Sequence, residues 1–580
     1  MTGKPSTDKP WLNHYSADEY EKALPKATVY ECLRAKNADY PKGIALEYFG
    51  RKISYRELFI NIDSVAKALK SAGVKKGDFV AISMPNTPEM VYLFYALNKI
   101  GAHANMVNPL FSTEQIASHL KNTGCKLAIV LNLLYDKVSG AIAQSNIEKT
   151  VIASPTASLP LLLKTLSALK KKPSIPRSST IIAWEKFIAD GRRYNGELFE
   201  SYAKDTPAVM VYSSGSTGAS KGIILTNESF NNLTLMHEVE SIGIKRGQRI
   251  LSIIPYFFST GISPSLNMPL CLGVTVILEP KFSREAFVKQ IRKSKPNHAI
   301  AATSLWEAIL DDEKLKKSDL SFFRLIISGG EAMPDSLRLE INAFLKEHNS
   351  SAEIGMGWGM CEFGASVAST AMNCKENCGA GIPLSHITVS AFDVDTDEEL
   401  SFNQRGELRV VTPCRMLGYY KNSEATDEFF RKGKDGQIWG CSGDVGFVNE
   451  EGNVFVVGRA NDYIIGSDGN KIWLFDIENV MLTDGAVQTC EAAGLDIRGG
   501  QVPVAHLVLK QGCVETPETI IKRIHEVCQK SLPPDAVPRG YKLRDGFGVL
   551  PSGKRDTLSL KKERDGLLVP DDDGLREVSF

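Results

Sequence analysis

A glycine- and hydroxyl-rich loop between two apolar runs constrains this chain more than any other stretch. The apolar runs are residues 208–211 and 223–226, and the loop is Tyr212-Ser213-Ser214-Gly215-Ser216-Thr217-Gly218-Ala219-Ser220-Lys221-Gly222. Apolar runs of this length are typical of buried strands. Consecutive amides in a glycine-rich loop form a concavity that binds anions, and the hydroxyls and Lys221 add donors and a positive charge. The stretch therefore predicts a polyphosphate-binding loop.

Two other interpretations of this loop fit less well. A Walker A loop needs G-x-x-x-x-G-K-[ST] leading into a helix. Here Gly218 stands three residues before Lys221, and Gly222 follows where a magnesium-binding Ser or Thr should stand. A flexible Ser/Gly linker is disfavoured because such linkers rarely carry a lysine between two apolar strands.

The remaining chain predicts an α/β fold. Residues 79–84 and 104–109 are apolar runs that predict strands. Residues 88–100 between them predict a helix, with Pro88 in its first turn. Strand, helix and strand in this order indicate a parallel sheet. Residues 325–332 predict a further strand that ends in a Gly-Gly turn, and open α/β sheets bind ligands at the carboxyl ends of such strands.

Composition excludes several classes of protein. Lys+Arg and Asp+Glu both number 68, so the net charge is zero, which argues against a general nucleic-acid binder. No run of about 18 apolar residues and no apolar signal core is present, so we expect a cytoplasmic chain with at most peripheral membrane contact. The eleven cysteines are expected to be reduced, and Cys374 and Cys378 lack a second pair that would indicate zinc.

Two segments lie outside these patterns. Residues 1–28 are expected to form an extended arm with Trp11 in its apolar anchor. Residues 154–193 carry apolar residues beside the basic run Lys170-Lys171-Lys172. A surface helix with solvated charges is the favoured interpretation of this insertion, and an element at a membrane surface or acyl tunnel is the alternative.

The loop at 212–222 resembles the signature loop of the adenylate-forming superfamily, which includes acyl-CoA synthetases, peptide-synthetase adenylation domains and luciferases. Its usual form is Y-[ST]-S-G-[ST]-T-G-x-P-K-G, and Ser220 replaces the proline. Further stretches resemble later motifs of the family in the same order, across roughly residues 30 to 560: residues 255–261, 357–362, 406–410 with 418–420, 441–444, 458–465 and 551–554.

The resemblance implies a domain organisation. A large multi-lobed adenylation domain with βαβ sheets would occupy residues 1–460, and a small mobile α+β lid would occupy residues 461–560. Asn461 stands where the family usually has a hinge Asp or Lys. Residues 561–580 are expected to be a polar tail that is disordered from Asp571 onward.

The resemblance also implies the roles of individual residues. Trp358 would stack on adenine, Asp444 would accept hydrogen bonds from the ribose, and Lys554 would bridge the acid's carboxylate and the α-phosphate. Catalysis is assigned to Lys554, Glu362 and Thr217, of which Glu362 and Thr217 would hold Mg²⁺. The acid would contact Phe258, Gly261, Ser304, Gly329 and Gly359. The ATP-binding set comprises Ser213, Ser214, Gly215, Ser216, Thr217, Gly218, Lys221, Gly330, Glu331, Ala332, Trp358, Gly359, Cys361, Asp444, Arg459 and Lys554.

The implied reaction is ATP-dependent activation of a carboxylic acid to acyl-AMP with release of pyrophosphate, followed by thioester formation with coenzyme A. A fatty or other apolar acid is favoured, because residues 255–267 lack the acidic side chain that would hold an α-ammonium group. One alternative is an adenylation enzyme that loads the phosphopantetheine of a separate carrier protein. Another is a catalytically silent acyl- or nucleotide-binding homologue, since Cys361, Asn461 and an extra residue near 468 depart from the family pattern.

Overall fold

The structure, a computed structural model, describes residues 2–579 except 157, 161–162, 166–177, 214–219, 241–242, 371–377, 435, 467–468, 498–499, 511, 549–556 and 572–573. The chain forms two compact units. The first comprises Met1–Ser442 and Phe447–Phe455, and the second comprises Gly443–Gly446 and Val456–Phe580. The predicted α/β class is confirmed. The second unit begins ahead of Asn461, and the position of a hinge at Asn461 stays a prediction.

The first sheet of the large unit holds the predicted loop strands. Its eight strands run in the order β19-β9-β8-β4-β3-β5-β6-β7, and β3 to β8 pair in parallel, whereas β9 and β19 are antiparallel to their neighbours. The strands are β3 (Phe79–Ser83), β4 (His103–Met106), β5 (Leu127–Leu131), β6 (Lys149–Ala153), β7 (Ile181–Ala183), β8 (Pro207–Tyr212), β9 (Gly222–Thr226) and β19 (Gly418–Tyr419).

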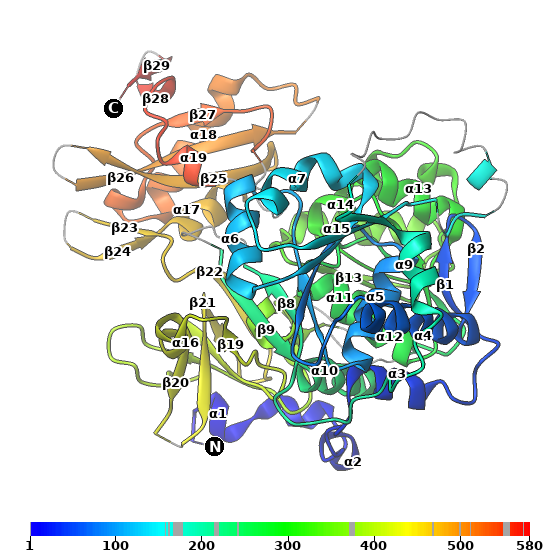
Figure 1. The fold of residues 1–580 in the computed structure, drawn as a ribbon. Coiled ribbons are helices and arrows are strands. Elements are labelled where there is room, and N and C mark those ends of the chain that lie inside the picture. Colours follow the sequence, from blue (N-terminus) through cyan, green and yellow to red (C-terminus); the bar gives the residue numbers. More distant parts are fainter. Residues whose placement is uncertain are drawn as a thin grey trace. The chain divides into compact units, whose positions relative to one another are not determined.

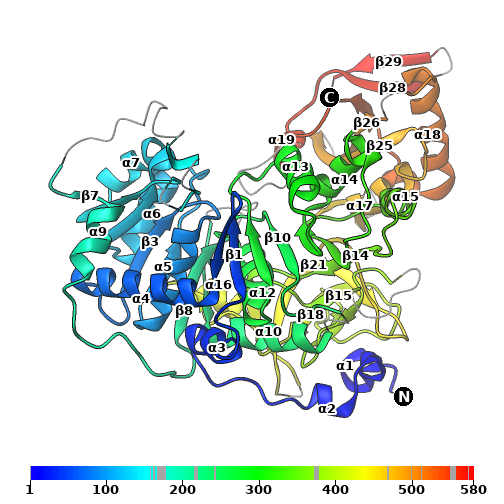
Figure 2. The ribbon, with the colours of Figure 1, turned by 90° about the vertical axis from the view of Figure 1, so that its right-hand side faces the viewer.

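Helices cover both faces of this sheet (Figure 2). On β5, Leu127 and Ile129 belong to the core shared with α4 (Tyr55–Ser71) and α5 (Pro88–Lys99). The alternate residues Ala128 and Val130 pack against the helices of the other face, α6 (Thr113–Thr123) and α7 (Tyr135–Ala143). Near-continuous apolar strands are expected where both faces of a parallel sheet are buried.

The second sheet of the large unit has nine strands in the order β16-β15-β14-β13-β12-β10-β11-β1-β2. Leu251, Ala299 and Ile326 pack against helices α13 (Arg284–Ser294), α14 (Thr303–Asp311) and α15 (Asp335–Glu347) (Figure 1). The strands are β1 (Ile44–Tyr48), β2 (Arg51–Ser54), β10 (Arg249–Ser252), β11 (Thr275–Leu278), β12 (His298–Ala301), β13 (Leu325–Gly329), β14 (Ile354–Trp358), β15 (Ala368–Ser369) and β16 (Ile382–Pro383).

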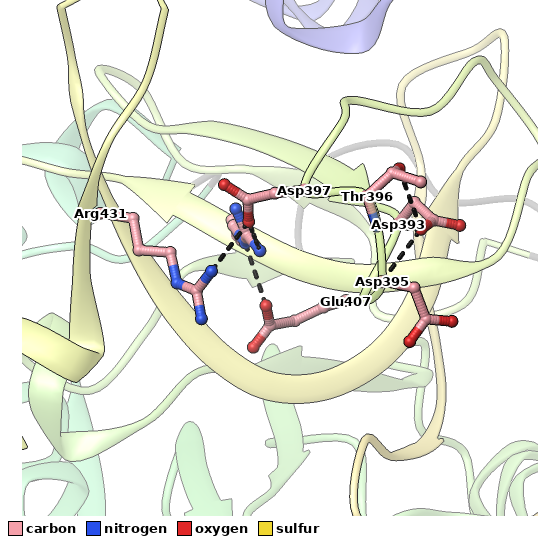
Figure 3. A network of polar contacts seen from close by, with 7 residues as sticks. Asp393, Asp395, Thr396, Asp397, Glu407 and Arg431 are labelled. Carbon is pink, nitrogen blue, oxygen red and sulfur yellow. Dashed lines mark hydrogen bonds and ion pairs between the residues drawn. The ribbon is translucent and has the colours of Figure 1, made fainter.

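A third sheet contains β17 (Thr388–Phe392), β18 (Gly406–Val411), β20 (Phe430–Lys432) and β21 (Ile438–Val448). Its buried Arg409 lies 2.5 Å from Asp397 and 3.0 Å from Glu407, and Arg431 adds a second contact to Asp397 at 3.0 Å (Figure 3). A buried arginine needs such partners because an unpaired charge in the interior is costly. The network therefore has a structural role.

The N-terminal arm differs from the expected extended segment. It folds into short helices, α1 (Pro5–Asp8), η1 (Pro10–His14) and α2 (Ala17–Tyr20). Trp11 is fully buried, so its expected role as an apolar anchor is confirmed. The Tyr15 hydroxyl donates to the carbonyl of Pro383 at 2.9 Å. The buried Trp11 side chain and the hydrogen bond of Tyr15 hold this segment against the large unit, which favours compact turns over an extended arm.

The small unit contains an antiparallel hairpin of β23 (Tyr463–Ile465) and β24 (Lys471–Trp473) and a five-stranded sheet. The sheet order is β25 (Val487–Ile497), β26 (Gly500–Leu509), β27 (Tyr541–Leu543), β28 (Leu567–Asp571) and β29 (Gly574–Val578). The prediction of disorder from Asp571 onward is wrong for Gly574–Val578, which form strand β29. Leu567 is fully buried, and β28 and β29 extend the sheet as a hairpin, because the edge of β27 offers pairing that polar composition does not reveal.

Other predictions have mixed outcomes. No helix within the described part of the chain is long and apolar enough to cross a membrane. The basic run at Lys170–Lys172 and Cys374 lie outside the described residues. Cys378 is disulfide-bonded, which corrects the expectation that every cysteine is reduced. The described cysteines with free thiols are Cys32, Cys125, Cys271, Cys361, Cys414, Cys441, Cys490, Cys513 and Cys528.

Three buried histidines predict acid sensitivity. Burial lowers the pKa of His119, His298 and His506 to about 4 in each case. Unfolded histidine titrates near pH 6.5, so between about pH 6.5 and 4 the unfolded chain binds protons that the folded chain does not. The free energy of unfolding should therefore fall across this window, by up to about 3 kcal/mol per histidine.

Denaturant unfolding between pH 7.5 and 5 checks this expectation, because ordinary carboxylates titrate mostly below that range. His298→Gln should reduce the pH slope for the large unit, since the glutamine does not titrate. An unfolding free energy that stays constant from pH 6.5 to 5 would contradict the prediction.

Candidate active site

The neck of the polyphosphate loop is closed by hydrogen bonds between its two ends. The Ser213 amide donates to the Lys221 carbonyl at 3.0 Å, and the Lys221 amide donates to Ser213 Oγ at 2.9 Å. Antiparallel pairing of β8 with β9 brings these ends together. Ser214, Gly215, Ser216, Thr217 and Gly218 lie outside the described residues. The structure therefore places the neck of the loop, and ATP binding by the loop stays a prediction.

A buried carboxylate lies close to this neck. The Tyr419 hydroxyl donates to Glu362 Oε1 at 2.9 Å, and Lys221 Nζ lies 4.8 Å from the centre of the Tyr419 ring. Strand β19, which carries Tyr419, pairs with β9 directly after the loop. Burial and the Glu362 charge raise the pKa of Tyr419, so the hydroxyl keeps its proton and remains a donor. Tyr419 thus connects the lysine of the loop to the predicted metal ligand.

The turn that carries Glu362 requires glycine at Gly359. Glu362 lies in the short helix η5 (Cys361–Phe363), just after β14. A Cβ on Gly359 would lie 1.9 Å from the carbonyl oxygen of Ala365, a distance that no side chain tolerates. The Met416 amide donates to the Glu362 carbonyl at 2.7 Å and fixes the backbone further. Close backbone contacts therefore hold the carboxylate in one position.

Glu362 fits a magnesium ligand of the kind used with nucleotide substrates. Mg²⁺ usually keeps several waters and takes one or two protein carboxylates together with substrate phosphates. Among the residues that the structure describes, no cluster of three His, Cys, Asp or Glu side chains could hold a metal alone. A single buried carboxylate beside the neck of the predicted polyphosphate loop matches a site where substrate phosphates complete the Mg²⁺ coordination. Thr217 lies outside the described residues.

The aromatic segment 255–261 contacts the Glu362 turn directly. Ser259 Oγ donates to Cys361 Sγ at 3.0 Å. Phe257 and Phe258 are both partly exposed, with ring centroids 4.8 Å apart, and Phe257 packs against the core. A Cβ on Gly261 would lie 2.2 Å from the Pro255 carbonyl oxygen, so this segment also depends on a glycine. Core packing accounts for Phe257, and an acid-binding role for Phe258 stays open.

The predicted adenine and acid residues meet at the carboxyl ends of neighbouring strands. Gly329 on β13 pairs in register with Gly357 on β14, and Gly330 follows with φ +87°. The backbone amide of Ser304, at the start of α14, lies 3.5 Å from Glu331 Oε2. Ala332 follows Glu331, and Trp358 ends β14. The structure therefore brings these two sets of predicted residues to one edge of the second sheet.

The small unit contains the predicted ribose site. Arg459 Nη1 lies 3.0 Å from Asp444 Oδ1, and the Ala460 amide donates to the Gly443 carbonyl at 2.8 Å. The Asp444 side chain is 13% exposed and that of Arg459 is 49% exposed, so the carboxylate is mostly buried against an arginine that reaches solvent. Lys554 lies outside the described residues.

Sequence reasoning missed three residues that contact the loop neck or the Glu362 turn of the large unit. Tyr419, Ser259 and His119 each hydrogen-bond a predicted residue or the loop neck. Tyr419 and Ser259 stand inside stretches that resemble family motifs. The sequence could therefore have placed both residues near the site, but it could not have given their hydrogen-bond partners. His119 stands in a helix with no motif signal.

Asp444→Ala is expected to raise the KM for ATP at least tenfold, because it removes hydrogen bonds from the ribose hydroxyls to a charged acceptor. Such hydrogen bonds contribute more binding free energy than those to a neutral acceptor. Asp496→Ala, a change at a carboxylate on the same unit that pairs with Gln501, is the matched control. Steady-state kinetics with ATP as the varied substrate measures both. An unchanged KM in Asp444→Ala would remove this residue from the ribose site.

Comparisons with known proteins agree with this geometry. The family model described as AMP-binding enzyme matches residues 33–420. A long-chain-fatty-acid–CoA ligase of Bacillus subtilis (strain 168) is 27% identical over 556 residues, which cover 94% of this chain and 97% of the relative. The 4-coumarate–CoA ligase 1 of Petroselinum crispum is 26% identical over 486 residues, which cover 81% of this chain and 82% of the relative.

Solved structures show the same fold. An anthranilate CoA ligase in complex with anthranoyl-AMP superposes with a TM-score of 0.78 at 21% identity, covering 93% of this chain and 97% of the other. ATP-bound MatB from Rhodopseudomonas palustris superposes with a TM-score of 0.76 at 19% identity, covering 92% and 98%.

Proposed function

Since the chain belongs to the AMP-binding enzyme family and is an AMP-forming acid–CoA ligase, we propose that its substrate is a fatty or other apolar carboxylic acid. The observation that carries the proposal is the segment 255–267 beside the Glu362 turn. It contains no charged side chain, and residues 261–267 are buried. An α-ammonium group would find no carboxylate there to pair with, and a buried cation without a partner is costly.

The proposed chemistry needs no covalent protein nucleophile. The acid's carboxylate oxygen attacks the α-phosphorus of ATP, forming an acyl-phosphate bond as the bond to pyrophosphate breaks. The thiolate of coenzyme A then attacks the acyl carbon, forming the thioester and releasing AMP. Both steps need charge compensation on phosphate and alignment of the reactants.

The residues of the chain divide this work. Lys221 and the loop amides are proposed to bind the phosphates, and Glu362 is proposed to hold a magnesium ion with Tyr419 orienting its carboxylate. That ion would neutralise charge on the phosphate oxygens. Lys554 is proposed to bridge the two reacting groups, and Asp444 with Arg459 to bind the ribose.

Cys361 is proposed to make a weaker phosphate contact than the threonine of the family pattern would make. A thiol is a weak hydrogen-bond donor, and Cys361 stands where the family pattern has threonine. The Ser259 hydroxyl donates its single proton to the Cys361 sulfur at 3.0 Å, so it does not replace the donor that threonine would supply.

The alternatives differ in their acceptor and in their acid. A carrier-protein phosphopantetheine would take the place of coenzyme A in the second half-reaction. The relatives include both a fatty-acid ligase and 4-coumarate ligases, and the former matches the larger share of this chain.

The test is pyrophosphate release with ATP and Mg²⁺ across fatty, aromatic and amino acids, with and without coenzyme A. Release that depends on a fatty acid, with acyl-CoA as product, is the expected result. Release with an amino acid alone would overturn the proposed substrate, and release with an aromatic acid alone would narrow it to an apolar acid other than a fatty acid. Release without a CoA product would indicate a carrier protein, and bound ATP without release for any acid would favour the silent homologue.

A further inference from the structure

Ser220 makes a contact that proline in its place could not make. Ser220 Oγ lies 2.8 Å from His119 Nε2, and Ser220 directly precedes Lys221, whose amide and carbonyl close the loop neck. Proline would fix the backbone φ angle but would offer no side-chain hydrogen bond. Compared with the proline of the family pattern, Ser220 therefore lacks the fixed φ angle but makes a hydrogen bond to a residue distant in the sequence.

His119 is itself held in place by aromatic packing. Its ring stacks on that of Tyr212, with centroids 3.8 Å apart and 14° between the planes, and Phe111 packs edge-on at 5.5 Å. The Tyr212 hydroxyl donates to Asn105 Oδ1 at 2.8 Å. Tyr212 is the last residue of β8, so the histidine is attached to the strand that enters the loop and also to Ser220, just before β9.

The protonation of His119 gives the contact a direction. Burial lowers its pKa to about 4, so the ring is neutral near pH 7 and carries one proton. Its Nδ1 atom is buried and has no hydrogen-bond partner among the described residues. A buried N–H without an acceptor costs more than a buried lone pair without a donor. The proton therefore belongs on Nε2, which donates to Ser220 Oγ.

We propose that His119 is a positioning residue of the polyphosphate loop, which acts through Ser220 to hold the neck that presents Lys221. This inference rests on the proposed function of the loop as the ATP phosphate site. The neck is tied at three points: the two Ser213–Lys221 hydrogen bonds and the Ser220–His119 hydrogen bond. Loss of the third tie leaves the loop less ordered before ATP binds, so ATP binding then has to order it.

The variants Ser220→Ala and His119→Phe test the inference, because the phenylalanine keeps the aromatic stack on Tyr212 and removes the hydrogen bond. Each should lower kcat/KM for ATP in acid-dependent adenylation about five- to tenfold. The double variant should be no worse than either single variant, since all three lack the same contact. Thioester formation from supplied acyl-adenylate, which does not need the loop, should change less than twofold.

A matched control exists at another histidine. His348 stacks on Phe344 with centroids 4.2 Å apart and has Nε2 2.9 Å from the Lys316 carbonyl oxygen. His348→Phe removes a comparable contact far from the loop residues in the sequence and should leave the KM for ATP unchanged. Losses that add in the Ser220 and His119 double variant, or equal losses in both half-reactions, would overturn the proposal.

Calorimetric titration with Mg²⁺-ATP separates this proposal from the proposed function. The Kd for ATP should rise about five- to tenfold in Ser220→Ala, whatever acid the enzyme uses. If the unmodified chain binds ATP but adenylates none of the acids, the proposed function is contradicted. The difference in Kd for ATP between the unmodified chain and Ser220→Ala still tests the positioning role. An unchanged Kd in Ser220→Ala would overturn the positioning role even if His119→Phe fails to fold.

Discussion

Lys554→Ala is expected to reduce acyl-adenylate formation about a thousandfold while largely sparing thioester formation from supplied acyl-adenylate. The lysine follows Pro551-Ser552-Gly553, in the stretch that resembles the late lysine motif of the family. A cation between the acid's carboxylate and the α-phosphate opposes their mutual repulsion in the first step. In the second step the acyl-phosphate bond already exists, so this repulsion is absent.

The measurement is the rate of pyrophosphate exchange, compared with the rate of thioester formation from a synthetic acyl-adenylate. Lys562→Ala is the control, since Lys562 is an exposed lysine of the same unit. It should leave both rates unchanged. Equal loss of both half-reactions in Lys554→Ala would assign the lysine to folding or to general substrate binding instead.

The local elements of this fold could be predicted from the sequence because their signals are local. The apolar run before the loop became β8, and Pro88 begins α5 where a proline is tolerated best. The run that begins at residue 325 became β13, and Gly330 in the turn after it has a positive φ of 87°. In each case the signal and the structure that it specifies occupy the same few residues.

Contacts between distant segments could not be predicted in this way. Glu362 and Tyr419 are 57 residues apart, and His119 and Ser220 are 101 residues apart. Periodicity and turn signals report on neighbours along the chain, whereas these pairs depend on which strands become adjacent. The resemblance gave Glu362 a role but no partner, because a motif records residue types and not contacts.

The C-terminal strands show the same limit in another form. The three acidic residues Asp571–Asp573 indicated a polar tail, although Leu567, Leu568 and Val569 precede them, with Pro570 between. Leu567 is fully buried because β28 pairs with β27, a strand formed by residues 541–543. A short apolar run at the end of a chain is ordered only if a sheet edge is available, and composition does not show that edge.

Glu362→Gln should lower adenylation about a hundredfold and raise the Mg²⁺ concentration needed for half-maximal activity. Glutamine keeps the shape of the side chain, and its amide oxygen can still accept the hydrogen bond from Tyr419. The change therefore removes the charge and preserves the position. Tyr419→Phe does the reverse, since it leaves the charge and removes the contact that orients it, and a smaller loss of about tenfold is expected.

The Tm of Glu362→Gln should not fall with its activity. A buried carboxylate is costly, so Glu362→Gln should leave the Tm unchanged or raise it while activity falls. Glu407→Gln is the contrasting control, because Glu407 lies 3.0 Å from the buried Arg409. Weakening that pair should lower the Tm without altering the Mg²⁺ requirement. If Glu362→Gln instead lowers the Tm and keeps the normal Mg²⁺ requirement, the carboxylate is a structural group and the metal site must lie elsewhere.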